Sequence, residues 1–422
     1  MCLGFLPPGG TRFRKHRRPN GGGAKNEKSW NTVRRSAKKR KQKKKQQLTL
    51  QDCFGFDVSS LSEEENEAIE ASGDPLIDKE SGSVRFAFQN IHGISIREGL
   101  HVMPEIATMG ALQIDVAALT ETNVHWNQAN REKMAQQLYT HLGHSRVVCA
   151  SNVSTRNEDG YQPGGSMLAV VGPQCGRMQK RGSDPWGRFS WTEMRGGRDE
   201  GILVISAYRV SQKRGAKAGP FTAYSQQVDN MIREGDHTLD PRTRILTDLE
   251  NLITEKRALG FRPILMMDAN DDWLDSKSTA FRSFLERVQL VDPMHNKFSD
   301  GGITPTTYAR GIRRIDFIFV DATIEPAIKR IGSLGLHEGI NSDHVMLYMD
   351  CDEDELFKGV LNRPVLNPAR EFVIEHADKC EKFLERFWKL AKEKRLSNNA
   401  LFSSPRTLKS TVHQKLIFGS FI

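Results

Sequence analysis

The segment PILMMDAN, residues 263–270, decides the fold of this chain. A short apolar run of this kind is typical of a strand buried on both faces. The run ends in two polar residues, Asp268 and Asn270. Ligands of sheet-based α/β folds bind where strands end and loops begin. The segment therefore predicts a buried strand that carries functional groups at its carboxyl end.

Other β-rich runs surround this segment, and helical patterns separate several of them. The runs are VRFAFQN (84–90), IDVAALTE (114–121), RVVCAS (146–151), SMLAVVG (166–172), ILVISAYRV (202–210), RIDFIFVD (314–321) and HVMLYM (344–349). This interleaving over residues 83–352 predicts an α/β (α+β) four-layer sandwich, in which two stacked mixed β-sheets are flanked by helices.

One of the intervening helices is marked at both ends. Asp240 is a suitable N-cap and Pro241 a suitable first residue, while Gly260 ends the pattern. Another helix has its apolar face at Val102 and Ile106. These signals predict helices between the strands, as the layered fold requires.

The charge of the chain is divided unevenly. The net charge is +9, but residues 11–47 alone hold sixteen Lys and Arg against one Glu, which leaves the rest of the chain at −6. No run approaches the ~20 apolar residues of a membrane helix, so a membrane-spanning protein is excluded. The six cysteines show no C-x-x-C pair, which disfavours a disulfide framework or structural zinc.

Composition predicts four regions. Residues 1–47 form a disordered basic tail, because they offer too little apolar surface to fold. Residues 48–82 form an acidic linker, and residues 83–352 form the folded domain. Residues 353–422 are a C-terminal extension with an amphipathic helix over 368–396, which either packs on the domain or meets a partner.

Two short segments in the tail and linker are candidate docking motifs. The basic run within residues 34–45 is a nuclear-import signal read by importin, a polyanion-binding arm or a solubilising tail. The first interpretation predicts a nuclear protein. Gln47, Leu50 and Phe54 resemble the motif that binds sliding clamps, and the alternative is a short apolar bump in a linker.

Polar residues suited to metal and phosphate follow or adjoin most of the predicted strands. They are Asn90, Glu121, Tyr208, Asp268, Asn270, Asp316, Asp343 and His344. Any one of them alone is more often a turn or cap residue. Their joint occurrence beside β-runs indicates one shared site at the strand ends.

The ordered motifs QNIHG (89–93), LTET (119–122), SAY (206–208), DAN (268–270), RIDFIF (314–319) and SDH (342–344) resemble those of the endonuclease/exonuclease/phosphatase superfamily. Within it, residues 83–352 are most similar to the endonuclease domains of non-LTR (LINE-type) retrotransposons. The resemblance implies a divalent-metal-dependent phosphodiester hydrolase.

The resemblance also implies a metal site. Glu121 would be the principal ligand of one Mg²⁺ or Mn²⁺, and Asn90 and Asp343 would complete the protein's share of the coordination sphere. Hard cations of this kind prefer carboxylate and amide oxygens.

The remaining motif residues would act on the phosphodiester. Asp268 would orient and deprotonate the attacking water, and Asn270 would hold a phosphate oxygen. His344 would donate to the scissile phosphate, with Asp316 orienting its ring. Tyr208 would contact the phosphate or the leaving oxygen, although a Tyr in a strand is commonly a core residue.

The chain departs from the superfamily pattern in two places. Met267 stands where Gly usually precedes the Asp of the DAN motif, and Val210–Ser211 replaces the usual Pro-Asn after Tyr208. A bulky residue at the first place could crowd the strand end. Basic and polar residues in two loops are candidates for DNA contact, with a solvated turn as the alternative for the second loop. They are Lys213, Arg214 and Lys217, then Thr307, Tyr308, Arg310, Arg313 and Arg314.

Together these features favour a retrotransposon-derived DNA endonuclease that leaves a 3′-hydroxyl at its nick. The alternatives are an apurinic-site repair nuclease, a phosphatase of the same superfamily, and a nucleic-acid-binding protein with a decayed nuclease core.

Overall fold

The computed structural model describes residues 69–96, 99–154, 161–197, 200–211, 222–238, 240–298 and 305–359, with positions 381, 382, 384–386 and 389. The basic tail, the clamp-like residues Gln47, Leu50 and Phe54, and the loop residues Lys213, Arg214 and Lys217 lie outside these ranges. Within the predicted helix 368–396, the six described positions are helical.

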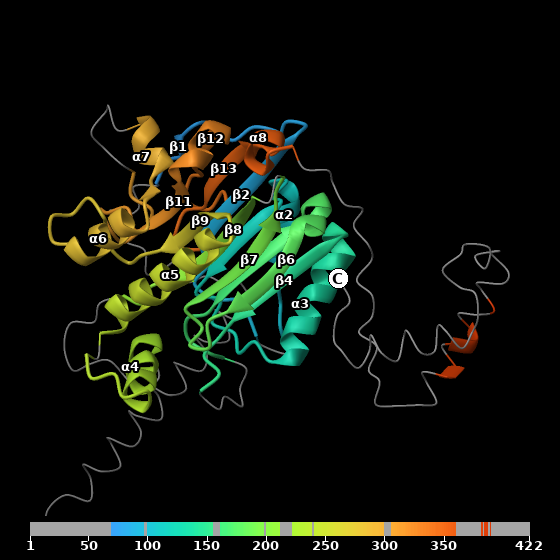
Figure 1. Ribbon diagram of the computed structural model, residues 1–422, viewed down its shortest axis with the longest axis horizontal. Coiled ribbons are helices and arrows are strands. Elements are labelled where there is room, and N and C mark those ends of the chain that lie inside the picture. The colour runs from blue at the N-terminus through green and yellow to red at the C-terminus, as the bar shows by residue number, and fades with distance from the viewer. Residues whose placement is uncertain are drawn as a thin grey trace, which may run out of the picture. The chain divides into compact units, whose positions relative to one another are not determined.

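The described chain forms two mixed β-sheets (Figure 1). The seven-stranded sheet has the order β1 (Ser72–Gly73), β12 (Ile328–Ser333), β13 (Leu347–Asp352), β2 (Ser83–Asn90), β3 (Val116–Thr120), β5 (Ser166–Val171) and β4 (Ser145–Ala150). The six-stranded sheet has the order β10 (Leu290–Val291), β11 (Asp316–Asp321), β9 (Phe261–Asp268), β8 (Gly201–Tyr208), β7 (Phe189–Arg195) and β6 (Met178–Ser183). Strands β2 and β3 are parallel, as are β8 and β9, and the other pairs are antiparallel.

Helices connect the strands. They are α2 (Met103–Ala111), α3 (Gln128–Leu142), α4 (Ala223–Arg233), α5 (Pro241–Ala258), α6 (Thr279–Arg287), α7 (Pro293–Phe298) and α8 (Glu353–Phe357), with 3-10 turns at Gly172–Arg177 and Ala322–Ala327. The carboxylate of Asp240 caps α5 by accepting from the Arg242 N–H, as predicted. No helix among the described residues is long and apolar enough to cross a bilayer.

Three apolar clusters define four layers, which confirms the predicted sandwich. Alternate residues of each central strand face opposite ways: Phe86 of β2 and Met266 of β9 join the cluster between the sheets. Ala87 of β2 faces the cluster under α2 and α3. Met267 of β9 faces the cluster under α5 and α6. The two helical layers therefore cover the outer faces of the two sheets.

The folded unit is larger than residues 83–352. Strand β1, from the predicted linker, pairs with β12, and Leu356 and Phe357 of α8 are fully buried beyond the other boundary. Sequence patterns also missed β6, β7, β10 and β12, and the last strand begins at Leu347 rather than at residue 344. β6 is largely exposed and β12 is partly exposed over its first three residues, and the polar residues of both strands interrupt any apolar run.

Candidate active site

A row of polar side chains crosses the end of the six-stranded sheet. Asp268, the last residue of β9, lies directly opposite Tyr208 of β8 and Asp316 of β11 in the strand register. Residues paired in this way project from the same face of a sheet. Local strand pattern and register together therefore bring three of the predicted residues to one place.

Asp268 is the centre of a hydrogen-bond network that joins the two sheets. Its Oδ2 accepts from Asn90 Nδ2 of β2 at 2.8 Å and from Asn270 Nδ2 at 3.2 Å, and its Oδ1 accepts from the Asn270 backbone N–H at 2.8 Å. Burial, followed by the negative charge of Asp316, raises the pKa of the Asp268 carboxyl. The positive charge of His344 opposes this shift and favours the ionised carboxylate, which is the form that can act as a general base.

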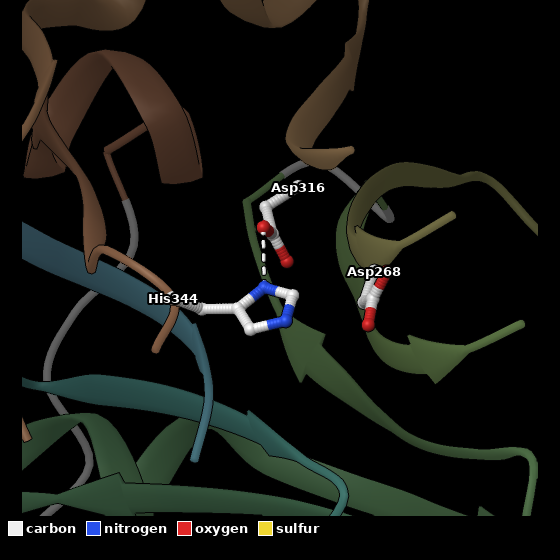
Figure 2. Close-up of side chains that lie close together, drawn as sticks. All are labelled: Asp268, Asp316 and His344. Atoms are coloured by element: carbon white, nitrogen blue, oxygen red, sulfur yellow. Dashed lines mark hydrogen bonds and ion pairs between the residues drawn. The ribbon is translucent and has the colours of Figure 1, made fainter. Parts of the chain in front are cut away.

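The His344 ring lies beside both Asp316 and Asp268 (Figure 2). Its Nδ1 is 2.8 Å from Asp316 Oδ2, which fixes the ring and leaves Nε2 on the side of Asp268. Burial alone would lower the pKa of His344, but the charges of Asp316, Asp268 and Asp343 raise it to about 10. The imidazole is therefore protonated at neutral pH and can donate from Nε2 to an anionic ligand.

The loop that carries His344 is held by two side chains. Gln89 of β2 donates to the carbonyls of Ile340 at 2.7 Å and His344 at 2.8 Å, and it accepts from the Ile340 N–H. The Ser342 hydroxyl donates to the Asn90 carbonyl and accepts from the His344 N–H. Sequence reasoning quoted both residues inside motifs but gave neither a role. The available signal was a glutamine directly after the apolar residues of β2 and directly before Asn90.

The segment before β11 supports the site from its other side. Thr307 is fully buried, and its hydroxyl accepts from the N–H groups of Ile315 at 3.0 Å and Asp316 at 3.1 Å. The Tyr308 ring packs on His344 with 4.8 Å between ring centroids. The expected DNA contact by Thr307 is therefore corrected, because its hydroxyl is turned inward to hold the backbone of Asp316.

The three arginines of this segment differ in burial. Arg314 is 2 % exposed and pairs with Asp292 through both of its terminal nitrogens, at 2.7 and 3.2 Å, so the expected DNA contact is corrected here too. Arg313 is exposed and pairs with Asp275 at 3.1 Å, and Arg310 is exposed. Only the last two, with Tyr308, remain candidates for DNA contact among the described residues of this segment.

A second group of acidic residues lies at the end of the other sheet. Glu121 follows β3 and Asp343 precedes His344. Oxygens of both carboxylates lie within 4 Å of His92 Nδ1, at 3.9 and 3.8 Å, so both side chains converge on one point. Three non-glycine residues around this end have positive φ, His92 (53°), Glu121 (49°) and Asn123 (54°), as does Asn270 (47°) after β9. Backbone strain of this kind is common at functional sites.

The donors present fit a hard divalent cation. Asp343 Oδ1 is buried, and it has no hydrogen-bond partner within the described part of the chain. Glu121 is only partly exposed and offers a second carboxylate. A cation would compensate both charges, and carboxylate oxygens are the ligands Mg²⁺ and Mn²⁺ accept.

Asp268, Asp316 and His344 also offer ligand atoms within 4.8 Å of one another. Of these three, His344 pairs with Asp316 Oδ2 and Asp268 accepts from Asn90 and Asn270, while the buried Asp316 Oδ1 has no hydrogen-bond partner among the described residues. This cluster holds groups suited to proton transfer, and Glu121 and Asp343 offer carboxylates suited to a cation.

Burial decides the roles of Tyr208 and Met267, for which the sequence left two interpretations open. Tyr208 is 6 % exposed, and burial followed by the charges of Glu121 and Asp268 raises the pKa of its phenol well above the usual value. It therefore keeps its proton and lies within the site rather than in the apolar core. Met267 packs in the cluster under α5 and α6, on the face opposite Asp268, so it does not crowd the carboxylate.

Comparisons with known proteins gave structural likenesses alone. No protein-family model matches the chain, and no curated protein matches it. A crystal structure of the AP endonuclease LMAP from Leishmania major has a TM-score of 0.46 at 16% identity, covering 64% of this chain and 88% of that one. The human Nocturnin catalytic domain with bound sulfate has a TM-score of 0.42 at 12% identity, covering 64% of this chain and 95% of that one. At these scores the assignment of the site rests on its own geometry.

Proposed function

We propose that this protein is a divalent-metal-dependent phosphodiester hydrolase that nicks DNA and leaves a 3′-hydroxyl. The observation that carries the proposal is the meeting of two hydrogen-bonded pairs, Asn90–Asp268 and Asp316–His344. The carboxylates of Glu121 and Asp343 converge beside them. This arrangement supplies a base, a proton donor and a cation site within one small region. Metal-assisted hydrolysis of a phosphodiester uses all three.

Each residue of the site has a separate role in the proposed reaction. Asp268 holds and deprotonates a water, while Asn90 and Asn270 orient its carboxylate. His344, held by Asp316, donates its Nε2 proton to a non-bridging phosphate oxygen. The protonated phenol of Tyr208, beside Glu121, donates a hydrogen bond to the phosphate or the leaving oxygen. A metal held by Glu121 and Asp343 would offset the negative charge that develops on the phosphate and the departing oxygen.

DNA as the substrate is supported by charge. The tail at residues 11–47 is strongly basic, and the exposed Arg310 and Arg313 lie in the segment that carries Tyr308 against His344. We propose that these arginines and the loop residues Lys213, Arg214 and Lys217 contact DNA phosphates. Replacement of the three loop residues by Ala should flatten the salt dependence of DNA binding by roughly one unit of slope for each lost contact. An unchanged slope would remove them from the interface.

The remaining sequence-based expectations extend this proposal. We propose retrotransposon origin on the motif resemblance, nuclear localisation through importin recognition of residues 34–45, and sliding-clamp binding through Gln47, Leu50 and Phe54. Localisation of a tagged chain with and without residues 34–45 tests the import signal. Pull-down by a clamp, with Phe54→Ala as the variant, tests the docking motif.

The central experiment is nicking of supercoiled plasmid by the full chain with Mg²⁺, Mn²⁺ or EDTA. We expect metal-dependent nicking, lowered by about 10²–10⁴-fold in His344→Gln, the range typical of a lost general acid. Glu121→Gln should be restored in part by high metal concentration. The matched controls are His141→Gln and Glu286→Gln, which replace exposed residues on α3 and α6.

The outcomes separate the alternatives. Nicking of abasic DNA alone would indicate a repair nuclease, and release of inorganic phosphate from small phosphoesters would indicate a phosphatase. DNA binding without cleavage of any of these substrates would contradict the hydrolase assignment and favour a binding protein.

A further inference from the structure

His92 occupies a place that the catalytic roles above do not explain. Its Nδ1 lies 3.9 Å from Glu121 Oε2 and 3.8 Å from Asp343 Oδ1, on carboxylates from two different segments of the chain. Both separations are too long for a hydrogen bond. The side chain is 71% exposed, so neither packing nor a hydrogen bond accounts for its position between the two acids.

The backbone at this position aims the ring. His92 has a φ of 53°, in the left-handed region, and its N–H donates to Asn90 Oδ1 at 3.0 Å. Left-handed backbone in a residue other than glycine costs free energy, and it persists where the surroundings impose it. The strained turn directs the imidazole to the end of the sheet that carries Glu121.

The same hydrogen bond occupies one of the two acceptor positions of the Asn90 amide oxygen, which the sequence predicts as a metal ligand. Asn90 Oδ1 accepts from His92, and Asn90 Nδ2 donates to Asp268 at 2.8 Å. Asn90 therefore connects the base to the His92 turn. Asp343 Oδ1, by contrast, is buried with no hydrogen-bond partner among the described residues. The atoms that converge on an uncompensated point are thus two carboxylate oxygens and one imidazole nitrogen.

We propose that His92 Nδ1 is the third protein ligand of the metal, together with Glu121 and Asp343, and that the site prefers Mn²⁺ to Mg²⁺. This inference rests on the metal of the proposed function. Adjacent ligands bound about 2.1 Å from one cation in octahedral geometry, the geometry of Mg²⁺ and Mn²⁺, are about 3.0 Å apart. The observed separations of 3.9 and 3.8 Å exceed this by about 0.8–0.9 Å, a distance that rotation of an exposed side chain about χ1 and χ2 supplies.

The preference follows from ligand chemistry. Mg²⁺ takes oxygen ligands almost exclusively and keeps several waters. Imidazole nitrogen suits first-row transition cations, and Mn²⁺ accepts both nitrogen and carboxylate oxygen. One nitrogen among two carboxylates therefore favours Mn²⁺ relative to an all-oxygen site. The competing explanation is that a protonated His92 lies between the acids as an ion-pair partner and leaves when metal binds.

Pulsed EPR of Mn²⁺ bound to the full chain distinguishes the two explanations without measuring catalysis. A coordinated imidazole gives a nitrogen hyperfine coupling to the Mn²⁺ electron spin, whereas oxygen ligands give none. The test variant is His92→Asn, because Asn tolerates left-handed backbone but removes the ring. The matched control is His337→Asn, which replaces an exposed histidine that also has positive φ, 74°. His344→Gln removes the other imidazole of the site.

We expect one bound Mn²⁺ with nitrogen coupling in the wild type, in His337→Asn and in His344→Gln. The coupling should vanish in His92→Asn, with Mn²⁺ affinity weakened by about tenfold or more and Mg²⁺ affinity weakened less. Bound Mn²⁺ without nitrogen coupling, coupling that survives in His92→Asn, or failure to bind Mn²⁺ would each overturn the proposal. Nicking with Mg²⁺ that persists in those cases would leave the proposed function intact, so the two failures are distinguishable.

Discussion

Replacement of Thr307 by valine isolates one link between the fold and the site. Valine has nearly the shape of threonine, so packing at this fully buried position is kept. What is lost is the hydroxyl acceptor for the N–H groups of Ile315 and Asp316, at 3.0 and 3.1 Å. Asp316 is the first residue of β11 and holds His344, so the change loosens the proton donor without touching it.

The magnitude follows from the two donors left without their partner. A buried group that loses its hydrogen bond costs about 1–3 kcal/mol. Because one hydroxyl serves both N–H groups, we expect Thr307→Val to lower the free energy of unfolding by about 2–6 kcal/mol. Displacement of Asp316 by a fraction of an ångström should slow nicking by about 10- to 100-fold, since catalytic geometry is sensitive on this scale.

Urea unfolding followed by tryptophan fluorescence measures the first effect, and plasmid nicking at equal folded fraction measures the second. Thr307→Ser keeps the hydroxyl and should retain nearly full nicking, while Thr247→Val, on an exposed position of α5, should change neither quantity. A loss below about 1 kcal/mol in Thr307→Val, or equal loss of nicking in the Ser and Val variants, would refute the reasoning.

Three further changes have defined outcomes. Asp316→Asn should slow nicking by about 10²–10⁴-fold and move the alkaline limb of the pH–rate profile to lower pH, because Asp316 raises the pKa of His344; an unmoved limb would contradict this. Met267→Ala, at a fully buried position, should cost about 2–5 kcal/mol of unfolding free energy in urea; a smaller cost would mean that the site repacks. Burial raises the pKa of Glu105 above 4.5, so its contribution to stability falls as pH rises past that value. Glu105→Gln should therefore stabilise the protein at pH 7 but not at pH 4, in parallel urea titrations, and equal effects at both pH values would contradict the assignment.

Much of the fold was predictable from local sequence. The apolar runs around Phe86 and Met266 were predicted as strands and Asp240 as the N-cap of α5, and the structure confirms them. These features are predictable because a strand buried on both faces and a helix cap each have a pattern within a few residues of sequence. Strands β6 and β12 were missed because partly exposed strands carry polar residues that no periodicity distinguishes from a loop.

Several residues of the site have contacts that local sequence patterns do not predict. Arg314, in a run of basic residues, looks like a solvated turn, yet it is buried because Asp292, distant in sequence, offers it a carboxylate. Thr307 was predicted to contact DNA because it lies in the same loop. The sequence around it does not show that its hydroxyl is buried and accepts from the Ile315 N–H. His92 was quoted within a motif, but only its separation from Glu121 and Asp343 gives it a chemical meaning.

The sequence by itself determined which residues stand at the strand ends, because strand burial and the polar residue that ends it are encoded within a few positions. Tertiary structure decided which of these residues meet. Asn90 reaches Asp268 across 178 positions, and His344 reaches Asp316 only because β13 and β11 belong to sheets stacked face to face. The burial that raises the pKa of Asp268, and the convergence of Glu121 and Asp343 on His92, arise from that stacking. Charge and solvent access depend on everything packed around a residue, and no local pattern records it.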